Sequence, residues 1–192
     1  PRFCKSLVRQ AEKRLQWIKD AKMAKSVLAI KGVNDVLMSY FPLDHFSKSM
    51  RKSRDHCMKA ISWHADNIKH RGGCKKLRND AELHLHALRC GALDKTHTVG
   101  EGKIFTHSVR LLNNREYMTE ALTLSPLLAR VVSYYRPQHL KQHEDLLICL
   151  VMSNPEKYYM QFYKLPLRKL QECIRHLEHI KVMPQIWHKI QF

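Results

Sequence analysis

The chain has 192 residues, with 34 Lys and Arg against 17 Asp and Glu, so its formal net charge is +17. An apolar content of 44% with six Gly and seven Pro is typical of a globular protein and excludes disordered, collagen-like and linker-like chains. No apolar run approaches the length that a transmembrane helix requires, which excludes such a helix.

The N-terminal part of the chain is predicted to contain two long helices. Apolar residues recur every three or four positions in residues 3–30, which predicts the first. A short helical turn over residues 34–40 follows. The second helix is predicted to begin at Asp44, a good N-cap, and to end at Gly72-Gly73. Its apolar stripe consists of Phe46, Met50, Cys57, Ile61, Ala65 and Ile68.

A third helix and a β-hairpin are predicted in the middle of the chain. Asn79 and Glu82 form a capping-box pattern before a helix over residues 80–90, although the alternation of residues 82–86 also allows a strand. Residues 96–99 and 103–107 flank a Gly-Glu-Gly turn, which predicts a small hairpin over about 96–107 that packs on helices.

From Arg115 onward the chain is predicted to be helical, with prolines at its corners. Ser125-Pro126 and Asn154-Pro155 each read as an N-cap followed by Pro, and the interval between them also separates Pro137 from Pro166. The pattern marks two helix-hairpin units. Two copies are too few for a solenoid, so an ordinary bundle is favoured.

The predicted fold class is therefore mainly α, an irregular helical bundle with one small β-hairpin and a C-terminal helix-hairpin region. Three regions are expected. They are a basic helical region over 1–78, a connector of helix and hairpin over 79–114, and a helical-hairpin region over 115–192.

The positive charge is concentrated in the first two-fifths of the chain. Residues 1–78 carry 19 Lys and Arg against 6 Asp and Glu, whereas residues 79–192 carry 15 against 11. A cluster of this kind suits the successive charges of a phosphate backbone, and glycine lets a backbone approach closely. The predicted RNA-binding residues are Lys48, Arg51, Lys52, Arg54, Lys59, Lys69, Arg71, Lys75, Lys76 and Arg78.

Structured RNA is the partner that the sequence favours. No zinc-finger spacing, basic zipper or helix-turn-helix points to DNA, and no RNP or KH motif indicates base-specific reading. The hypothesis is a structural component of a ribonucleoprotein, namely a mitochondrial ribosomal protein that contacts rRNA and neighbouring proteins. The alternative is an accessory subunit of a large mitochondrial membrane-associated complex, whose basic face meets anionic lipid or acidic subunits. Six cysteines in 192 residues indicate a reducing compartment, which for this hypothesis is the mitochondrial matrix.

Histidine and cysteine offer a further alternative, a small zinc-binding helical domain. The candidate ligands are His70, Cys74, His86 and Cys90, with His84 nearby. Their spacing matches no standard finger or ribbon, so no cofactor is predicted.

Enzymatic motifs are missing from the sequence. It contains no GxSxG, no Walker loop and no HExxH. The trio His143-Glu144-Asp145 has acid–base side chains but reads more simply as the polar first turn of a buried helix. No catalytic residue and no small-molecule substrate are therefore predicted.

Overall fold

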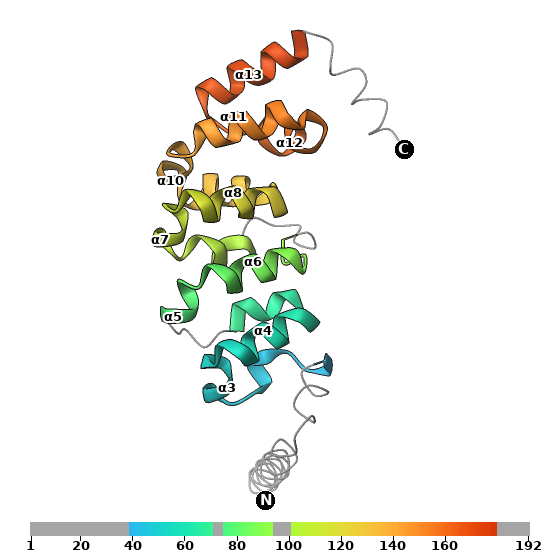
Figure 1. The fold of residues 1–192 in the computed structure, drawn as a ribbon, viewed down its shortest axis with the longest axis vertical. Helices are drawn as coiled ribbons and strands as arrows, with labels where there is room; N and C mark the ends of the chain where they lie inside the picture. The colour runs from blue at the N-terminus through green and yellow to red at the C-terminus, as the bar shows by residue number, and fades with distance from the viewer. Residues whose placement is uncertain (1–38, 71–74, 94–100, 180–192) are drawn as a thin grey trace, which may run out of the picture. The chain divides into compact units, whose positions relative to one another are not determined.

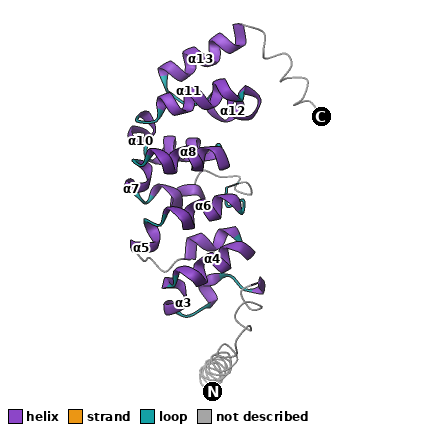
Figure 2. Ribbon diagram, in the orientation of Figure 1, coloured by secondary structure: helices purple, strands orange, loops and turns teal. Residues whose placement is uncertain are grey.

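The computed structural model describes residues 39–70, 75–93 and 101–179. The chain divides into two compact units, Pro1–Pro42 and Leu43–Phe192, and the fold of the second is described below. Its described residues are mainly helical and contain no strand (Figure 2), which confirms the mainly α prediction. In the described ranges, no helix has the length and apolar character that crossing a membrane requires. The predicted helix over residues 3–30 lies outside the described residues.

After a first 3-10 turn, η1 (Leu43–His45), the helices of this unit follow a repeating order. Each repeat has a short first helix, a second helix of nine or ten residues, and a third helix. Repeat 1 is α3 (Lys48–Lys52), α4 (Arg54–Trp63) and η2 (Ala65–His70), and repeat 2 is α5 (Lys75–Arg78), α6 (Ala81–Arg89) and η3 (Glu101–Thr106). Repeat 3 is α7 (Val109–Leu112), α8 (Arg115–Leu124) and α9 (Leu127–Tyr135), and repeat 4 is α10 (Pro137–Lys141), α11 (Glu144–Ser153) and α12 (Pro155–Phe162). A longer helix, α13 (Arg168–His179), follows them.

The same sequence pattern produces each repeat. The residue that caps the second helix is Ser53, Asp80, Asn114 or His143. An apolar anchor stands one turn before each cap, and further core residues stand about two turns after it. The anchors are Met50, Leu77, Leu111 and Leu140, and the last core positions are Ile61, Leu88, Leu122 and Val151. The two proline-marked units are offset from these repeats, because the first runs from α9 into α11 and the second from α12 into α13.

Successive repeats pack against one another. Helix α4 contacts α6, and α6 contacts α8, so the second helices of repeats 1 to 3 lie side by side in chain order (Figure 1). Helix α9 contacts both η3 and α12, and α11 contacts α12 and α13. Apolar burial between neighbours is the main stabilising term, because a single short repeat cannot cover its own apolar face.

The prediction of one continuous helix from Asp44 is wrong, but most of the residues predicted to form its buried face are buried. It is divided at Ser53 and His64, which both have extended backbone angles. Ser53 ends α3, where its N–H bonds the Met50 carbonyl, and also begins α4. The buried Asn67 connects η2 to η1 and α4, because its side chain accepts from Leu43 N at 2.7 Å and donates to Ala60 O at 2.8 Å. Four of the six predicted stripe residues are buried, namely Phe46, Cys57, Ile61 and Ile68.

The predicted β-hairpin over about 96–107 is not found. Its first arm, residues 96–99, lies outside the described residues, and most of its second arm belongs to the 3-10 helix η3. Gly102 allows η3 to pack closely against Val131 of α9, because a Cβ at this position would lie 2.6 Å from Val131 Cγ2. Phe105 and Thr106 are both buried, whereas a two-stranded hairpin would expose every second residue.

The later helices agree with the sequence pattern more closely. The helix over 80–90 is confirmed, which excludes the strand alternative, but its N-cap is Asp80, which accepts from Leu83 N at 3.0 Å, and not the predicted Asn79. Asn154 caps α12 by accepting from Lys157 N at 3.0 Å, with Pro155 at the first helical position as predicted. Ser125 instead ends α8, and α9 begins after Pro126.

Candidate nucleic-acid interface

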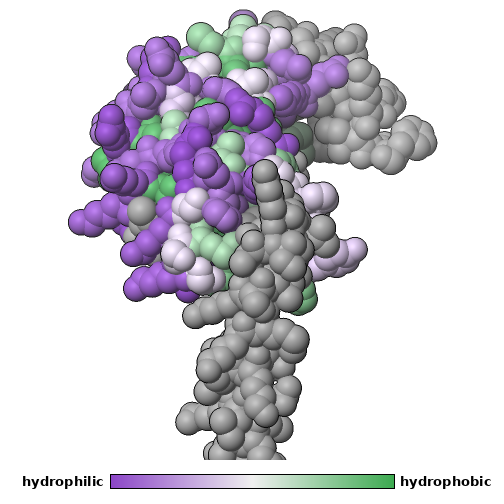
Figure 3. Space-filling model, turned by 60° about the horizontal axis from the view of Figure 1, so that its bottom comes forward, coloured by the Kyte–Doolittle hydropathy of each residue, from purple (hydrophilic) through white to green (hydrophobic). Residues whose placement is uncertain are grey.

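The short first helices carry the most one-sided charge of the described residues. Between them α3, α5, α7 and α10 contain eight Lys and Arg and no Asp or Glu. We call this set the basic edge, which consists of Lys48, Arg51, Lys52, Lys75, Lys76, Arg78, Arg110 and Lys141. Figure 1 draws all four helices on one side of the unit, and the same side is predominantly hydrophilic in Figure 3.

The shortness of these helices explains why six of their eight cations are exposed. A helix of four or five residues completes about one turn, so it needs only one apolar residue to hold it against the core. In α5, α7 and α10 that anchor is buried. Side-chain N-caps stabilise short helices of this kind. In α7, for example, the Ser108 hydroxyl accepts a hydrogen bond from Leu111 N at 3.2 Å. Apart from Leu112 of α7, which is also buried, the remaining positions of α5, α7 and α10 are not needed for the core and can carry exposed charge.

Six of the ten predicted RNA-binding residues belong to the basic edge. Lys48, Lys52, Lys75 and Lys76 are exposed, while Arg51 and Arg78 are half-buried. The Nε atom of Arg51 is buried and has no hydrogen-bond partner within the described ranges. Lysines on one-turn helices can follow a phosphate as mobile point charges, whereas an arginine can hold it with two donors.

Of the other four predicted residues, two are already held by carboxylates. Arg54 donates to Asp80, with 2.7 Å between Nε and Oδ2, and it also contacts Glu82. These hydrogen bonds raise the pKa of Arg54 above its usual value. Lys69 pairs with Asp66 at 3.0 Å. Arg54 and Lys69 are therefore partly neutralised within the fold, and we do not assign them to the binding of a polyanion.

Lys59 is exposed on α4, and Arg71 lies outside the described residues. Arg110 and Lys141 join the basic edge from repeats 3 and 4, although the sequence cluster does not include them. They occupy the short helices α7 and α10, which contact each other. Alignment of the four repeats is the signal that would have identified them.

The predicted zinc ligands are brought together only in part. Cys90 Sγ lies 3.8 Å from His86 Nε2, which is also 2.8 Å from Ser62 Oγ. His84 points elsewhere, into the core, where it packs edge-on against Phe105 and Tyr117. Cys74 and the side chain of His70 lie outside the described residues.

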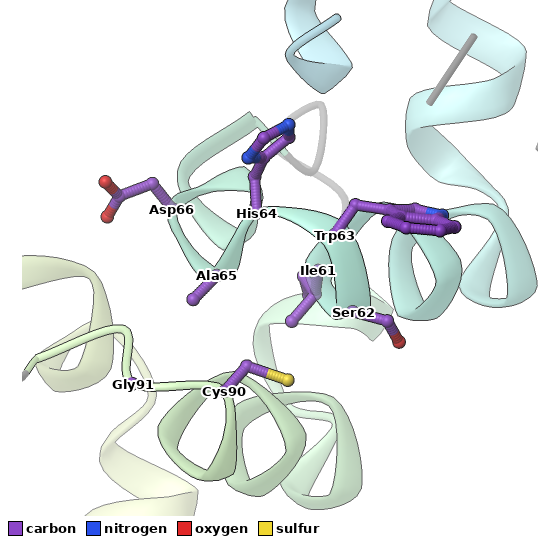
Figure 4. A pocket seen from close by; sticks show the side chains of 8 residues that line it. All are labelled: Ile61, Ser62, Trp63, His64, Ala65, Asp66, Cys90 and Gly91. Atoms are coloured by element: carbon purple, nitrogen blue, oxygen red, sulfur yellow. The ribbon is translucent and has the colours of Figure 1, made fainter. Parts of the chain in front are cut away.

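Cys90 and the end of α4 line a pocket of about 130 Å³ (Figure 4). Burial raises the pKa of the Cys90 thiol, which disfavours the thiolate that binds metals. Among the described residues, no three His, Cys, Asp or Glu side chains converge on a common point. The described part of the chain thus supplies a His–Cys pair, whereas structural zinc needs four ligands.

The trio His143-Glu144-Asp145 holds repeats together. The Nε2–H of buried His143 donates to the Leu112 carbonyl at 2.7 Å. Glu144 accepts from the backbone N–H of Lys169 at 3.2 Å, and Asp145 accepts from Arg115 at 2.7 Å. Each side chain contacts a neighbouring element, which accounts for the cluster of polar residues at the start of α11.

Comparison of the chain with protein-family models, with curated proteins and with solved structures gave no match. Function is therefore inferred from the charges and contacts of the molecule itself.

Proposed function

We propose that this chain is a non-enzymatic, RNA-binding structural component of a ribonucleoprotein. The observation that supports it is the basic edge, eight Lys and Arg on four successive short helices without one carboxylate. A nucleic acid presents negative charges at short, regular intervals, so a series of cations along successive repeats neutralises several phosphates at once and releases their counterions.

The geometry favours recognition of the backbone over recognition of the bases. A helix that reads base edges must enter a groove with several side chains, which takes longer elements than the four or five residues of α3 and α5. Short helices that present only cations contact the sugar–phosphate surface. Backbone contacts of this kind position a protein on folded RNA without reading its sequence, which suits a structural component of a large particle. The particle we propose is the mitochondrial ribosome in the matrix.

The first test measures binding of the full chain to a 20-bp RNA duplex by fluorescence anisotropy. Lys75→Glu/Lys76→Glu reverses two exposed charges of the basic edge and is expected to weaken binding roughly tenfold or more, because each lost phosphate contact removes a counterion-release contribution. The matched control is Lys169→Glu/Arg175→Glu, which reverses two exposed charges on α13. Equal weakening by both variants, or no duplex binding by the wild type, would contradict the proposal.

A second test separates RNA from the alternative partners. The tagged chain is sedimented from its native source with and without RNase. Release from a large particle by RNase supports the ribonucleoprotein. Persistence in a large complex after RNase favours instead an accessory subunit whose basic edge meets acidic proteins or anionic lipid.

A further inference from the structure

A second cationic surface lies between α9, the third helix of repeat 3, and the segment that follows α12. Arg130, Ser133 and Tyr134 of α9 line an open hollow of about 390 Å³ together with Lys164 and Leu165, which follow α12. Helices α9 and α12 contact each other, so both sides of the hollow belong to packed elements. Tyr134 is 72% exposed, an unusual state for a large ring on a packed helix. We call these five residues the tyrosine hollow.

The segments that form the tyrosine hollow carry no negative side chain. Residues 121–143 and 157–171 contain no Asp or Glu, but together contain seven Lys and Arg. Glu178, which reaches this region from α13, accepts a hydrogen bond from Tyr159 at 2.5 Å. An anion that enters the hollow therefore meets Arg130 and Lys164 without an opposing carboxylate from the two segments.

The surroundings already pair cations with aromatic rings. Lys103 lies over the ring of Tyr135 at 5.7 Å, and Lys164 lies over that of Tyr163 at 5.3 Å. The ring of Tyr134 packs edge-on against Tyr135 at 4.9 Å between centroids. The two rings are nearly perpendicular, at 82°, and most of the Tyr134 side chain stays exposed.

We propose that the tyrosine hollow binds an unpaired nucleotide of RNA, whose base stacks on Tyr134 while its phosphates contact Arg130 and Lys164. Every base has a π-face, so an exposed ring flanked by cations accepts single-stranded RNA without demanding a sequence. The hydroxyl of Ser133 adds a donor and an acceptor at the same place. An acidic peptide would use the two cations but would leave the exposed ring unexplained.

This inference rests on the proposed function and refines it. The basic edge lies on the first helices and suits duplex backbone, whereas the tyrosine hollow lies on α9 and the segment after α12 and suits an unpaired segment. One chain would then hold a folded RNA at a junction between paired and unpaired nucleotides.

The test compares a fluorescein-labelled 12-mer of oligouridine with the 20-bp duplex as ligands of the full chain. Tyr134→Ala is expected to weaken oligouridine binding roughly tenfold, the effect of losing one stacked base, and to leave duplex binding unchanged. Tyr134→Phe keeps the ring and should bind like the wild type. Tyr40→Ala is the matched control, because Tyr40 is 75% exposed but belongs to the other compact unit. Thermal unfolding of each variant checks that it is folded.

The outcomes distinguish the two proposals. If Tyr134→Ala behaves like Tyr40→Ala while Lys75→Glu/Lys76→Glu weakens duplex binding, the tyrosine hollow is refuted and the proposed function stands. If the wild type binds neither RNA, both fail. If a 12-residue poly-glutamate peptide competes as well as oligouridine, the hollow recognises an acidic protein and the inference is overturned.

Discussion

Arg115 of α8 donates to Asp145 of α11, with 2.7 Å between Nη2 and Oδ2, and this pair occupies the same repeat positions as Arg54 and Glu82. In both cases the arginine directly follows the cap of one second helix, and the acid stands two positions after the cap of the next. The ion pairs therefore fix neighbouring repeats in the same register. Between repeats 2 and 3 the arginine position holds an alanine, so Glu116 lacks the equivalent arginine.

Asp145→Asn is predicted to lower the melting temperature at pH 7 and to have a smaller effect at pH 3. The hydrogen bond from Arg115 is the main reason why the pKa of Asp145 lies below its ordinary value of 3.8. A lowered folded-state pKa stabilises the fold above the unfolded-state pKa, and this contribution is lost as the pH falls through the folded-state value. Because both side chains are about 60% exposed, the effect is small and is screened by salt.

Glu116→Gln provides the control for that measurement. Glu116 stands at the equivalent position of α8, also near a helix N-terminus, so its variant reports the loss of charge there without the ion pair. A similar fall in melting temperature for both variants would mean that the helix end, and not Arg115, is responsible.

Residue types and spacing predict much of this fold, and the failures have a common cause. The cap at Asn154 acts locally, through a side chain and a backbone N–H in the next turn, so the sequence shows it directly. For α6 the capping-box pattern indicates Asn79, whereas the cap is the next residue, Asp80. Gly102 is misread because a glycine between two β-prone segments looks like a turn. What requires glycine there is Val131 of the following repeat, and no local pattern reveals that contact.

The candidate site shows the same limit. A run of cations in the sequence identifies Lys48, Lys52, Lys75 and Lys76, which the structure leaves exposed. It also includes Arg54, whose carboxylate partners belong to repeat 2 and become visible only when repeats 1 and 2 are stacked. Conversely, Tyr134 gives no signal in the sequence, because exposure of an aromatic ring depends on what packs over it.

Gly102→Ala is predicted to destabilise the fold by about 1–3 kcal/mol, as expected for overpacking. The new Cβ would meet Val131 Cγ2 at 2.6 Å, Val131 Cγ1 at 3.0 Å and Leu93 Cδ2 at 3.1 Å. Denaturant unfolding measures the loss. Val131→Ala removes the two closest atoms, so the double variant should lose less stability than the two single losses added together. Strict additivity would show that the clash with Val131 is not what requires glycine.

Asp80 is predicted to contribute through two separable interactions. Its Oδ1 caps α6 and its Oδ2 accepts from Arg54, and its side chain is only 17% exposed. Asp80→Ala removes both interactions and should cost about 1 kcal/mol for the cap alone. Asp80→Asn keeps an oxygen for the cap and should lose less stability.

Salt separates the two contributions in denaturant unfolding. The loss caused by Asp80→Asn should shrink at high salt, because screening weakens the ion pair that this variant lacks. The loss caused by Asp80→Ala should largely persist, because the cap is still missing. Equal losses for the two variants would assign the whole effect to the charge on Asp80.

Lys141 offers the sharpest test of the basic edge, because only the alignment of repeats assigns it there. If Lys141 contacts a phosphate, Lys141→Gln should weaken binding to the 20-bp RNA duplex and reduce the slope of log affinity against log salt by about one. Arg175→Gln, an exposed cation on α13, is expected to leave the slope unchanged. The affinity is measured by anisotropy across a salt series. A slope unaltered by Lys141→Gln would remove this residue of repeat 4 from the interface.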